Sequence, residues 1–175
     1  MPRKETLRRA AADQRQGKAP TTQAGEFIKE TIDEIRQGKS GARSTKQAIA
    51  IGLSKARRAG VDLPPPQKGQ VSERTRKNAM RAYEVGQTNP DRPVNPKRSR
   101  AIKKVLQREG REAASHDALS RQTTQQARKR SPEERHESAV KAARTRMAHQ
   151  THAERQAIAR KAARTRKMRS KAEGD

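Results

Sequence analysis

Hydrophobic residues recur at helical spacing in two neighbouring segments of the chain, residues 21–37 and 44–60. Steps of three and four residues place them on one side of a helix and leave the other side polar. The connection of residues 39–43 includes Gly41 and is short, so the two helices are predicted to turn back on each other as a helical hairpin. The apolar positions are Ala24, Phe27, Ile28, Thr31, Ile32 and Ile35 in the first segment and Ala48, Ile49, Gly52, Leu53, Ala56 and Ala59 in the second.

The second segment carries its own start and stop signals. Ser44 is a helix cap, and Gln47, three residues later, is placed to bond back to the backbone N–H of Ser44, as in a capping box. Gly60 supplies the left-handed residue that ends a helix, and Val61 is expected to fold back onto Ala56, as in a Schellman motif. These signals predict one amphipathic helix with a basic C-terminal half.

The first segment is predicted to be capped by Thr22 and to stop at Gly38. Glu26, in its first turn, suits the positive end of the helix dipole. Gly52 of the second helix is interpreted as the point where the two helices approach most closely. The polar face of the first helix is acidic and consists of Glu26, Glu30, Asp33 and Glu34.

The hairpin of residues 21–63 has a small apolar inventory. Ordering about 40 residues costs more free energy than so few side chains return on burial. The hairpin is therefore expected to need a third helix, a second copy of itself or DNA. The available side chains are Phe27, Ile28, Ile32, Ile35, Ile49, Ile51, Leu53, Val61 and Leu63.

A third helix, capped by Ser72, is predicted over residues 72–85. Ala79, Met80 and Tyr83 share one side of it, and Met80 and Tyr83 are the candidates to close over the hairpin. Three consecutive prolines precede this helix and three more follow it, so residues 64–95 are interpreted as proline-rich linkers around one helix.

The regions on either side of this central part are basic. Residues 1–20 are expected to form a disordered basic arm. Residues 96–130 hold eleven Lys and Arg against three Asp and Glu, and Asn95-Pro96 starts a fourth helix that ends at Gly110. A further helical piece is predicted over residues 118–130, with Ser115 or Ser120 as its cap. The apolar stripe of the fourth helix is Ala101, Ile102, Val105 and Leu106.

Residues 131–175 contain an internal repeat at an offset of 20 residues. Each copy opens with a capping box, Ser131 with Glu134 and Thr151 with Glu154, and each contains the sequence Lys-Ala-Ala-Arg-Thr-Arg. Twenty residues is not a whole number of helical turns, so two short helices are predicted rather than one rod. Because these helices have little to bury, they are expected to form on binding.

Composition then indicates the partner. The 175 residues include 43 Lys and Arg against 19 Asp and Glu, a net charge of +24, with 29% hydrophobic residues, one Phe and one Tyr. The predicted fold class is mainly α, a small helical hairpin plus a third helix with extended, partly disordered basic arms. Such an excess of cations favours a polyanion as partner. We expect an intracellular protein without secretory signal, membrane partner or disulfide, since the chain has no cysteine and no long apolar run.

The central helix also resembles a known family. Ser44, Lys46, Gln47, Ala48, Ile49, Ala50, Ile51, Gly52, Leu53, Ser54, Ala56 and Arg57 are similar to the signature of small basic bacterial proteins of unknown function, some of them labelled DNA-binding. The resemblance covers about residues 18–130, including Arg108-Glu-Gly-Arg-Glu-Ala-Ala-Ser and Ala118-Leu-Ser-Arg-Gln. It implies a bacterial origin and DNA as partner, without a known mechanism. The C-terminal repeats are similar in composition to the Lys/Ala/Arg tails of linker-histone-like bacterial proteins.

Other chemistry is not expected. The second helix offers no row of base-reading side chains beyond Gln47, so a sequence-specific helix-turn-helix is disfavoured. His149 and His152 lack a third ligand in helical register except Glu154, and we interpret them as solvated. The chain shows no catalytic triad, phosphate loop or carboxylate pair, so neither an enzyme nor a cofactor or metal site is predicted.

Three functions remain open. The first is sequence-independent binding of duplex DNA in a bacterial nucleoid or plasmid, favoured over single strands because aromatic stacking residues are scarce. The second is an RNA- or ribosome-associated basic protein. The third is a protein-interaction module, with a possible homodimer through the hairpin of residues 21–63. The candidate nucleic-acid-binding residues are Arg43, Lys46, Lys55, Arg57, Arg58, Lys97, Arg98, Arg100, Lys103, Lys104, Arg108, Arg128, Lys129, Arg130, Lys141, Arg144, Arg146, Lys161, Arg164 and Arg166.

Overall fold

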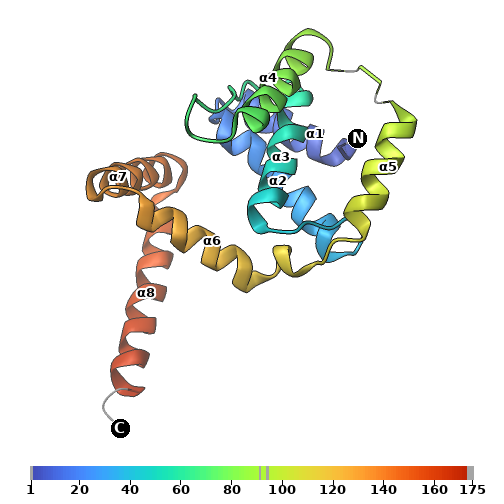
Figure 1. Ribbon diagram of the computed structural model, residues 1–175. Helices are drawn as coiled ribbons and strands as arrows, with labels where there is room; N and C mark the ends of the chain where they lie inside the picture. Colours follow the sequence, from blue (N-terminus) through green and yellow to red (C-terminus); the bar gives the residue numbers. More distant parts are fainter. Residues whose placement is uncertain (1, 91, 94, 173–175) are drawn as a thin grey trace. The chain divides into compact units, whose positions relative to one another are not determined.

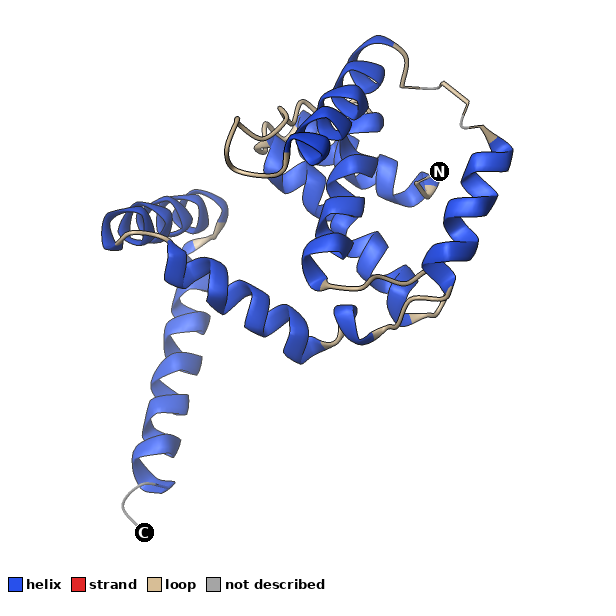
Figure 2. Ribbon diagram, viewed as in Figure 1, coloured by secondary structure: helices blue, strands red, loops and turns tan. Residues whose placement is uncertain are grey.

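The protein is mainly α-helical, as predicted (Figures 1 and 2). The computed structural model describes residues 2–90, 92–93 and 95–172. Their helices are α1 (Lys4–Arg15), α2 (Pro20–Arg36), α3 (Thr45–Arg58), α4 (Glu73–Thr88), α5 (Pro96–Gln107), the short 3-10 helix η1 (Glu112–Ala114), α6 (His116–Lys129), α7 (Pro132–His149) and α8 (His152–Ala172).

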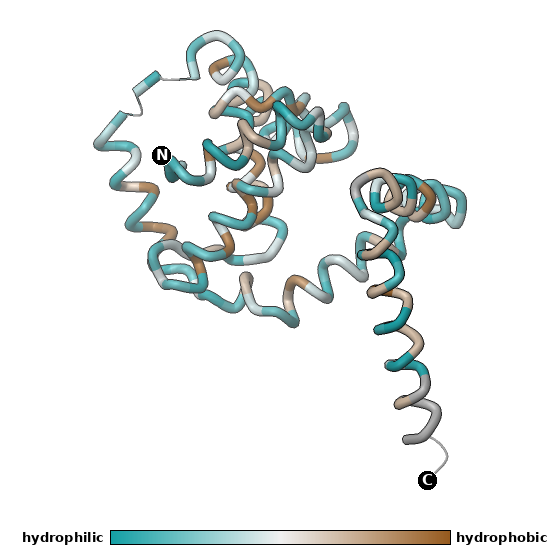
Figure 3. The backbone as a smooth tube through the Cα atoms, turned by 180° about the vertical axis from the view of Figure 1, so that it is seen from behind, coloured by the Kyte–Doolittle hydropathy of each residue, from teal (hydrophilic) through white to brown (hydrophobic). Residues whose placement is uncertain are grey.

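The chain divides into two units, Met1–Thr124 and Gln125–Asp175, with the boundary inside α6. The first unit holds both clusters of buried apolar residues. Hydrophobic segments accordingly gather along the backbone of α2 and α3, whereas the tube of α8 is mainly hydrophilic or pale (Figure 3). The core of the protein therefore belongs to the first unit.

The predicted hairpin of α2 and α3 is the centre of the first unit. Phe27 and Ile35 of α2 are 1% and 0% exposed, and Ala48 and Ala56 of α3 are fully buried. A Cβ atom at Gly52 would lie 2.6 Å from the Ile28 Cα atom, which confirms Gly52 as the point of close approach between the two helices. The hairpin is thus held by small residues on α3 that face large ones on α2.

The start and stop of α3 follow the local signals. The Ser44 hydroxyl accepts a hydrogen bond from the Gln47 N–H (3.2 Å), but the Gln47 side chain accepts from the N–H of Arg43 (2.9 Å) and not from that of Ser44. The predicted capping box is therefore shifted by one residue on its return bond. Gly60 has a φ of 87°, and the Val61 N–H donates to the Ala56 carbonyl (3.2 Å), which confirms the Schellman stop.

The bounds of α2 are confirmed at one end only. Gly38 has a φ of 69° and follows the last turn, as predicted. The helix starts with Pro20 at its first position, however, and its cap residue Ala19 makes no side-chain cap bond. Thr22 is therefore a residue inside the first turn rather than the cap, because a proline already supplies helical φ and has no N–H to satisfy.

The N-terminal segment differs from the disordered arm predicted for residues 1–20. It forms α1, which packs along α2. Thr6 and Ala10 are buried, and Ala10 joins the cluster of Ala24 and Phe27. Small residues let the two helices approach closely, so α1 is held without a stripe of large apolar side chains. A pattern-based prediction of a packed helix requires such a stripe, and residues 4–15 lack one.

Helix α4 supplies the third helix that the hairpin was expected to need, and Ser72 caps it (Thr75 N–H to Ser72 hydroxyl, 3.3 Å). Its contact face with α3 consists of Ala79, Ala82 and Gly86. Met80 is 38% exposed and does not close over the hairpin. The backbone of Gly86 lies directly against the carbonyl of Arg57, so α4 is part of the core and not a helix within a linker.

The segment after α5 docks on the base of the hairpin, a contact that the sequence pattern did not predict. Ala113 and Ala114 of η1 are buried with Ile35 and Ala48. The Thr45 hydroxyl donates to the Ala113 carbonyl (2.8 Å), and the Arg36 Nε atom donates to the Ala114 carbonyl (2.9 Å). Residues 96–130 are therefore partly built into the first unit.

The remaining helices begin where their caps were predicted. The Asn95 side chain accepts from the Arg98 N–H (3.2 Å) before α5, and the Ser115 hydroxyl accepts from the Ala118 N–H (3.2 Å) at the start of α6. Ser120 lies inside α6. Ser131 and Glu134 form a reciprocal capping box at α7, and Thr151 and Glu154 form one at α8. Two helices therefore replace a single rod, as predicted.

Candidate nucleic-acid interface

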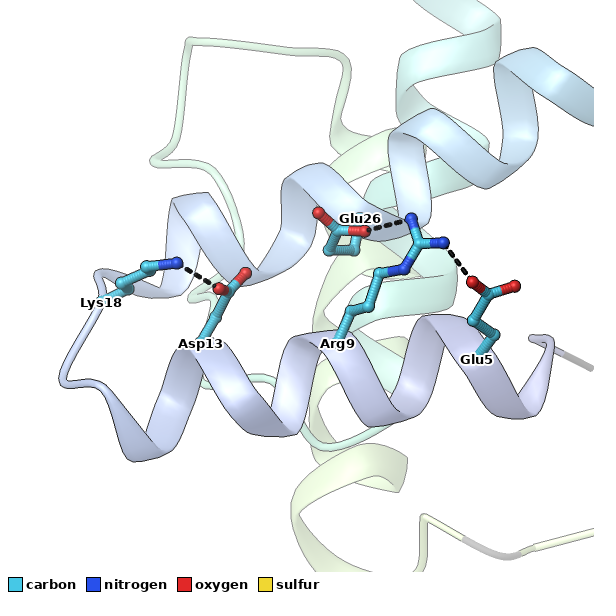
Figure 4. A network of polar contacts seen from close by, with 5 residues as sticks. All are labelled: Glu5, Arg9, Asp13, Lys18 and Glu26. Carbon is cyan, nitrogen blue, oxygen red and sulfur yellow. Dashed lines mark hydrogen bonds and ion pairs between the residues drawn. The ribbon is translucent and has the colours of Figure 1, made fainter. Parts of the chain in front are cut away.

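Seven of the twelve acidic residues that the structure describes in the first unit lie within 4 Å of a Lys or Arg of the same unit. Arg9 of α1 binds Glu5 on its own helix and Glu26 of α2, the latter at 3.5 Å, and Lys18 binds Asp13 at 2.6 Å (Figure 4). The hydrogen bond from Arg9 holds the pKa of Glu5 below its ordinary value. The paired carboxylates along α1 and the start of α2 therefore repel a polyanion less than free carboxylates would.

Most acidic side chains on the predicted acidic face of α2 are paired in the same way. Glu30 accepts a hydrogen bond from the backbone N–H of Arg3 (3.1 Å), and its carboxylate lies 3.9 Å from the Lys55 ammonium. Glu34 binds Lys55 at 2.7 Å. With Glu26 held by Arg9, three of the four acidic side chains of this face contact cations of α1 or α3 or the α1 backbone. This pairing leaves little of the face free to recruit a basic partner.

Two candidate residues on α3 do not belong to a phosphate-binding surface. Lys55 is directed to Glu34, and its side chain is 21% exposed. Arg57 is buried, and its guanidinium donates to the carbonyls of Leu63 (3.0 Å) and Pro64 (3.1 Å). Burial lowers the pKa of Arg57. The prediction of Lys55 and Arg57 as phosphate-binding residues is therefore corrected. Both cations make contacts that hold the first unit together.

The other cations predicted on the hairpin are exposed. Lys46 and Arg58 lie at opposite ends of α3 and are both solvent-accessible. Arg43 binds Glu109 at 2.8 Å, while its side chain remains 75% exposed. The hydrogen bond that Arg43 donates to the Glu109 carboxylate raises the pKa of Arg43. Of the candidate cations on the hairpin, Lys46 and Arg58 are thus the two that are exposed and form no ion pair with a described residue.

Helix α5 gathers the densest set of candidate cations in the first unit. Lys97, Arg100 and Lys104 follow steps of three and four residues, so they share one stripe of the helix, with Lys103 beside it. Arg98 lies on a different stripe, and Arg108 follows the last turn. All six are exposed, and among the described residues none lies within 4 Å of a carboxylate oxygen.

Helix α4 carries a second stripe that the sequence analysis missed. Arg74, Lys77 and Arg81 are exposed and follow the same steps of three and four residues. They lie opposite Ala79, Ala82 and Gly86, which face α3. The signal was present in the sequence, because the packed face of a helix fixes which positions face the solvent. It was overlooked because α4 was interpreted as a helix between linkers.

In the second unit every candidate cation is exposed. The residues are Arg128, Lys129 and Arg130 around the end of α6, Lys141, Arg144 and Arg146 on α7, and Lys161, Arg164 and Arg166 on α8. The acidic residues that open these helices act as caps: the backbone N–H of Thr151 bonds the Glu154 carboxylate and holds its pKa below the ordinary value. Both helices thus present long basic side chains that alternate with small residues such as alanine.

Such surfaces offer exposed cations that are able to contact phosphate groups. Exposed guanidinium and ammonium groups on rigid helices contact the backbone of a nucleic acid at many points. Among the described residues no cluster of three His, Cys, Asp or Glu is arranged to hold a metal ion. The side chain of His149, considered with His152 as a metal pair, lies outside the described part of the structure. No helix of the described chain is long and apolar enough to cross a bilayer.

Residues 21–68 match a family of unknown function (DUF6496). The match covers α2, α3 and the proline-rich segment that Arg57 fastens, which is a shorter stretch than the resemblance expected over residues 18–130. The name of that family gives no activity or ligand. The curated proteins and the solved structures gave no significant match to the chain.

Proposed function

We propose that the protein binds duplex DNA in a largely sequence-independent way by neutralising phosphates, as a bacterial nucleoid- or plasmid-associated protein that acts without catalysis. One observation carries the proposal. Several carboxylates of the first unit pair with cations inside that unit, while Arg74, Lys77 and Arg81 of α4, the cations of α5 and the candidate cations of α7 and α8 are exposed. The surplus positive charge therefore lies at the surface and is not neutralised by ion pairs among the described residues.

The type of cation contact favours phosphate over base recognition. Long basic side chains at steps of three and four residues form a row that can contact successive phosphates of a nucleic acid. Base readout instead needs amide or guanidinium groups that are held rigidly in a groove. Stacking of single-stranded bases needs aromatic side chains, and the chain has one Phe, which is 1% exposed, and one Tyr, whose hydroxyl donates to Asp62 (2.6 Å). Duplex DNA is the polyanion that fits these properties best.

The salt dependence of binding tests the proposal. The affinity of the full chain for a random-sequence duplex, measured by fluorescence anisotropy at several NaCl concentrations, is expected to fall linearly on a log–log scale. Each phosphate neutralised contributes a slope of about −0.9. Affinity that does not change with salt would contradict the proposal.

A matched pair of variants assigns the contacts. Replacing Lys97, Arg100, Lys103 and Lys104 together by Gln is expected to reduce the magnitude of the slope by about 3 to 4, since four phosphate contacts are lost. The control replaces four cations that already bind carboxylates by Gln: Arg9, Lys18, Arg43 and Arg76. It removes the same charge but is expected to leave the slope nearly unchanged. Equal losses in both variants would exclude α5 as a contact surface.

Competition between polymers separates DNA from RNA. Unlabelled duplex DNA, duplex RNA and single-stranded RNA of equal length compete for the labelled duplex at one salt concentration. Duplex DNA is expected to compete best. Stronger competition by RNA would support the RNA- or ribosome-associated alternative, which uses the same phosphate chemistry.

A further inference from the structure

Helix α5 presents an apolar stripe that nothing in the described chain covers. Ile102 is 49% exposed and Val105 is 53% exposed, and they lie beside Ala101 on one side of the helix. No residue of α5 is buried, and Leu106 alone among its larger apolar residues is half-buried. Phosphate binding makes no use of Ile102 and Val105, because the stripe of Lys97, Arg100 and Lys104 is turned away from these two side chains.

The charges of α5 restrict what can cover the stripe. The helix carries five cations and no carboxylate in its 12 residues, and Arg98 lies on the apolar side itself, so an anionic partner is favoured. It must also offer apolar contact to Ile102 and Val105. A DNA duplex provides phosphates but little apolar surface. A second copy of α5 provides apolar surface but brings Arg98, and with it another positive charge, to the interface.

Arg98 distinguishes the remaining partners. It precedes Ala101 and Ile102 by three and four residues, so it lies within the apolar stripe itself. In a packed interface with a second copy its guanidinium would be buried without a carboxylate, which is costly. At a lipid surface its long side chain can keep its stem among acyl chains and reach the headgroup phosphates.

We propose that the apolar stripe of α5 binds the surface of a bilayer rich in anionic phospholipid, with the helix lying in the plane of the interface. Ile102 and Val105 enter the acyl boundary, Arg98 reaches the phosphates around them, and the opposite cations remain at headgroup level or in water. This departs from the sequence-based expectation of no membrane partner, which rested on the lack of a spanning segment. A helix of 12 residues is too short to span a bilayer but long enough to lie on one.

A single tryptophan reports the contact directly, because the natural chain has none. The full-length Val105→Trp variant is mixed with vesicles of equal parts phosphatidylglycerol and phosphatidylcholine that contain a lipid with a quencher on its acyl chain. Its emission is expected to shift to the blue and to be quenched. The control is Ile158→Trp on α8, a site of equal exposure (53%) whose neighbours one turn away are Glu154, Arg155, Lys161 and Ala162, and it is expected to show neither change.

A second pair of variants separates insertion from adsorption by charge alone. Ile102→Asn with Val105→Asn is expected to weaken binding to the same vesicles about twentyfold, while DNA affinity and its salt dependence stay unchanged. Ile158→Asn is expected to weaken neither. Unquenched Val105→Trp emission, or wild-type vesicle affinity of the double variant, would overturn the proposal. So would a blue shift that grows with protein concentration in the absence of lipid, since a second copy would then cover the stripe.

Discussion

Arg57 shows how a cation at a surface-like position becomes part of the core. It stands in the basic last turn of α3, next to exposed Arg58. The chain turns back at Gly60, and the carbonyls of Leu63 and Pro64 come within hydrogen-bond distance of its guanidinium. The three prolines that begin at Pro64 have no backbone N–H, so they cannot donate a hydrogen bond to these carbonyls. The Arg57 guanidinium supplies the donors instead. Arg57 thus ties the proline-rich segment to the hairpin.

Replacement of Arg57 by Met is expected to lower the free energy of unfolding by about 2 kcal/mol, because two carbonyls lose their partner while the apolar stem is kept. Denaturant unfolding of the full chain, followed by circular dichroism, measures the change. Arg58→Met is the neighbouring control, expected to stay within about 0.5 kcal/mol of the wild type. If Arg57→Met instead kept full stability and reduced the salt slope of DNA binding, Arg57 would be a phosphate contact after all.

At the scale of the elements, α2 and α3 are held together by a close approach at one glycine. A side chain at Gly52 would meet the Ile28 backbone at 2.6 Å and its Cγ1 atom at 2.9 Å. Backbone atoms inside a helix cannot move without shifting the whole helix. The distance between α2 and α3 therefore depends on the absence of a Cβ atom at residue 52.

Gly52→Ala is expected to lower the free energy of unfolding by about 1 to 3 kcal/mol, since overpacking outweighs the better helix propensity of alanine. Gly25→Ala in α2 is the matched control. A Cβ atom there meets nothing within 4 Å, so this variant is expected to be more stable by about 0.5 to 1 kcal/mol. Thermal and denaturant unfolding of both variants measure the two changes. Stabilisation of Gly52→Ala would show that the helices separate at low cost.

For the whole molecule, the two units differ in what holds them. The first unit has buried clusters and internal ion pairs, whereas the candidate cations of α7 and α8 are all exposed and those helices rest on their capping boxes and alanine-rich sequence. Helices without tertiary packing are marginal in water, and like charges along them oppose their formation. A polyanion that neutralises these charges therefore stabilises the helices as it binds.

Titration with inorganic polyphosphate, which has no amide signal, is expected to increase the helical circular dichroism of the full chain at low salt. The increase is limited to roughly a fifth of the residues, because α7 and α8 comprise 18 and 21 of the 175. Ser131→Ala with Thr151→Ala is expected to lower the starting signal and to enlarge the increase. Ser72→Ala at α4, a helix held by packing on α3, is the control. A signal unchanged on saturation would contradict coupled folding.

The accuracy of the sequence-based predictions followed the range of the interactions. Caps at Ser44, Ser72 and Ser131 and stops at Gly38 and Gly60 depend on residues within one turn, and all were predicted. The packing of α1 on α2 was not, because it depends on small residues such as Ala10 rather than on a hydrophobic pattern. The docking of η1 was missed for the same reason, since Ala113 bonds Thr45 across 68 residues of chain.

The sequence by itself determined the mainly α fold, the places where most helices begin and end, and the surplus of positive charge, because each of these depends on composition or on neighbours within a few residues. Only the tertiary structure decided which cations are exposed. Lys55 meets Glu34 across 21 residues, and Arg57 meets the carbonyls that follow a chain reversal. Which partner Lys55 or Arg57 binds depends on how the helices pack, and a local pattern of charges along the sequence does not contain that information.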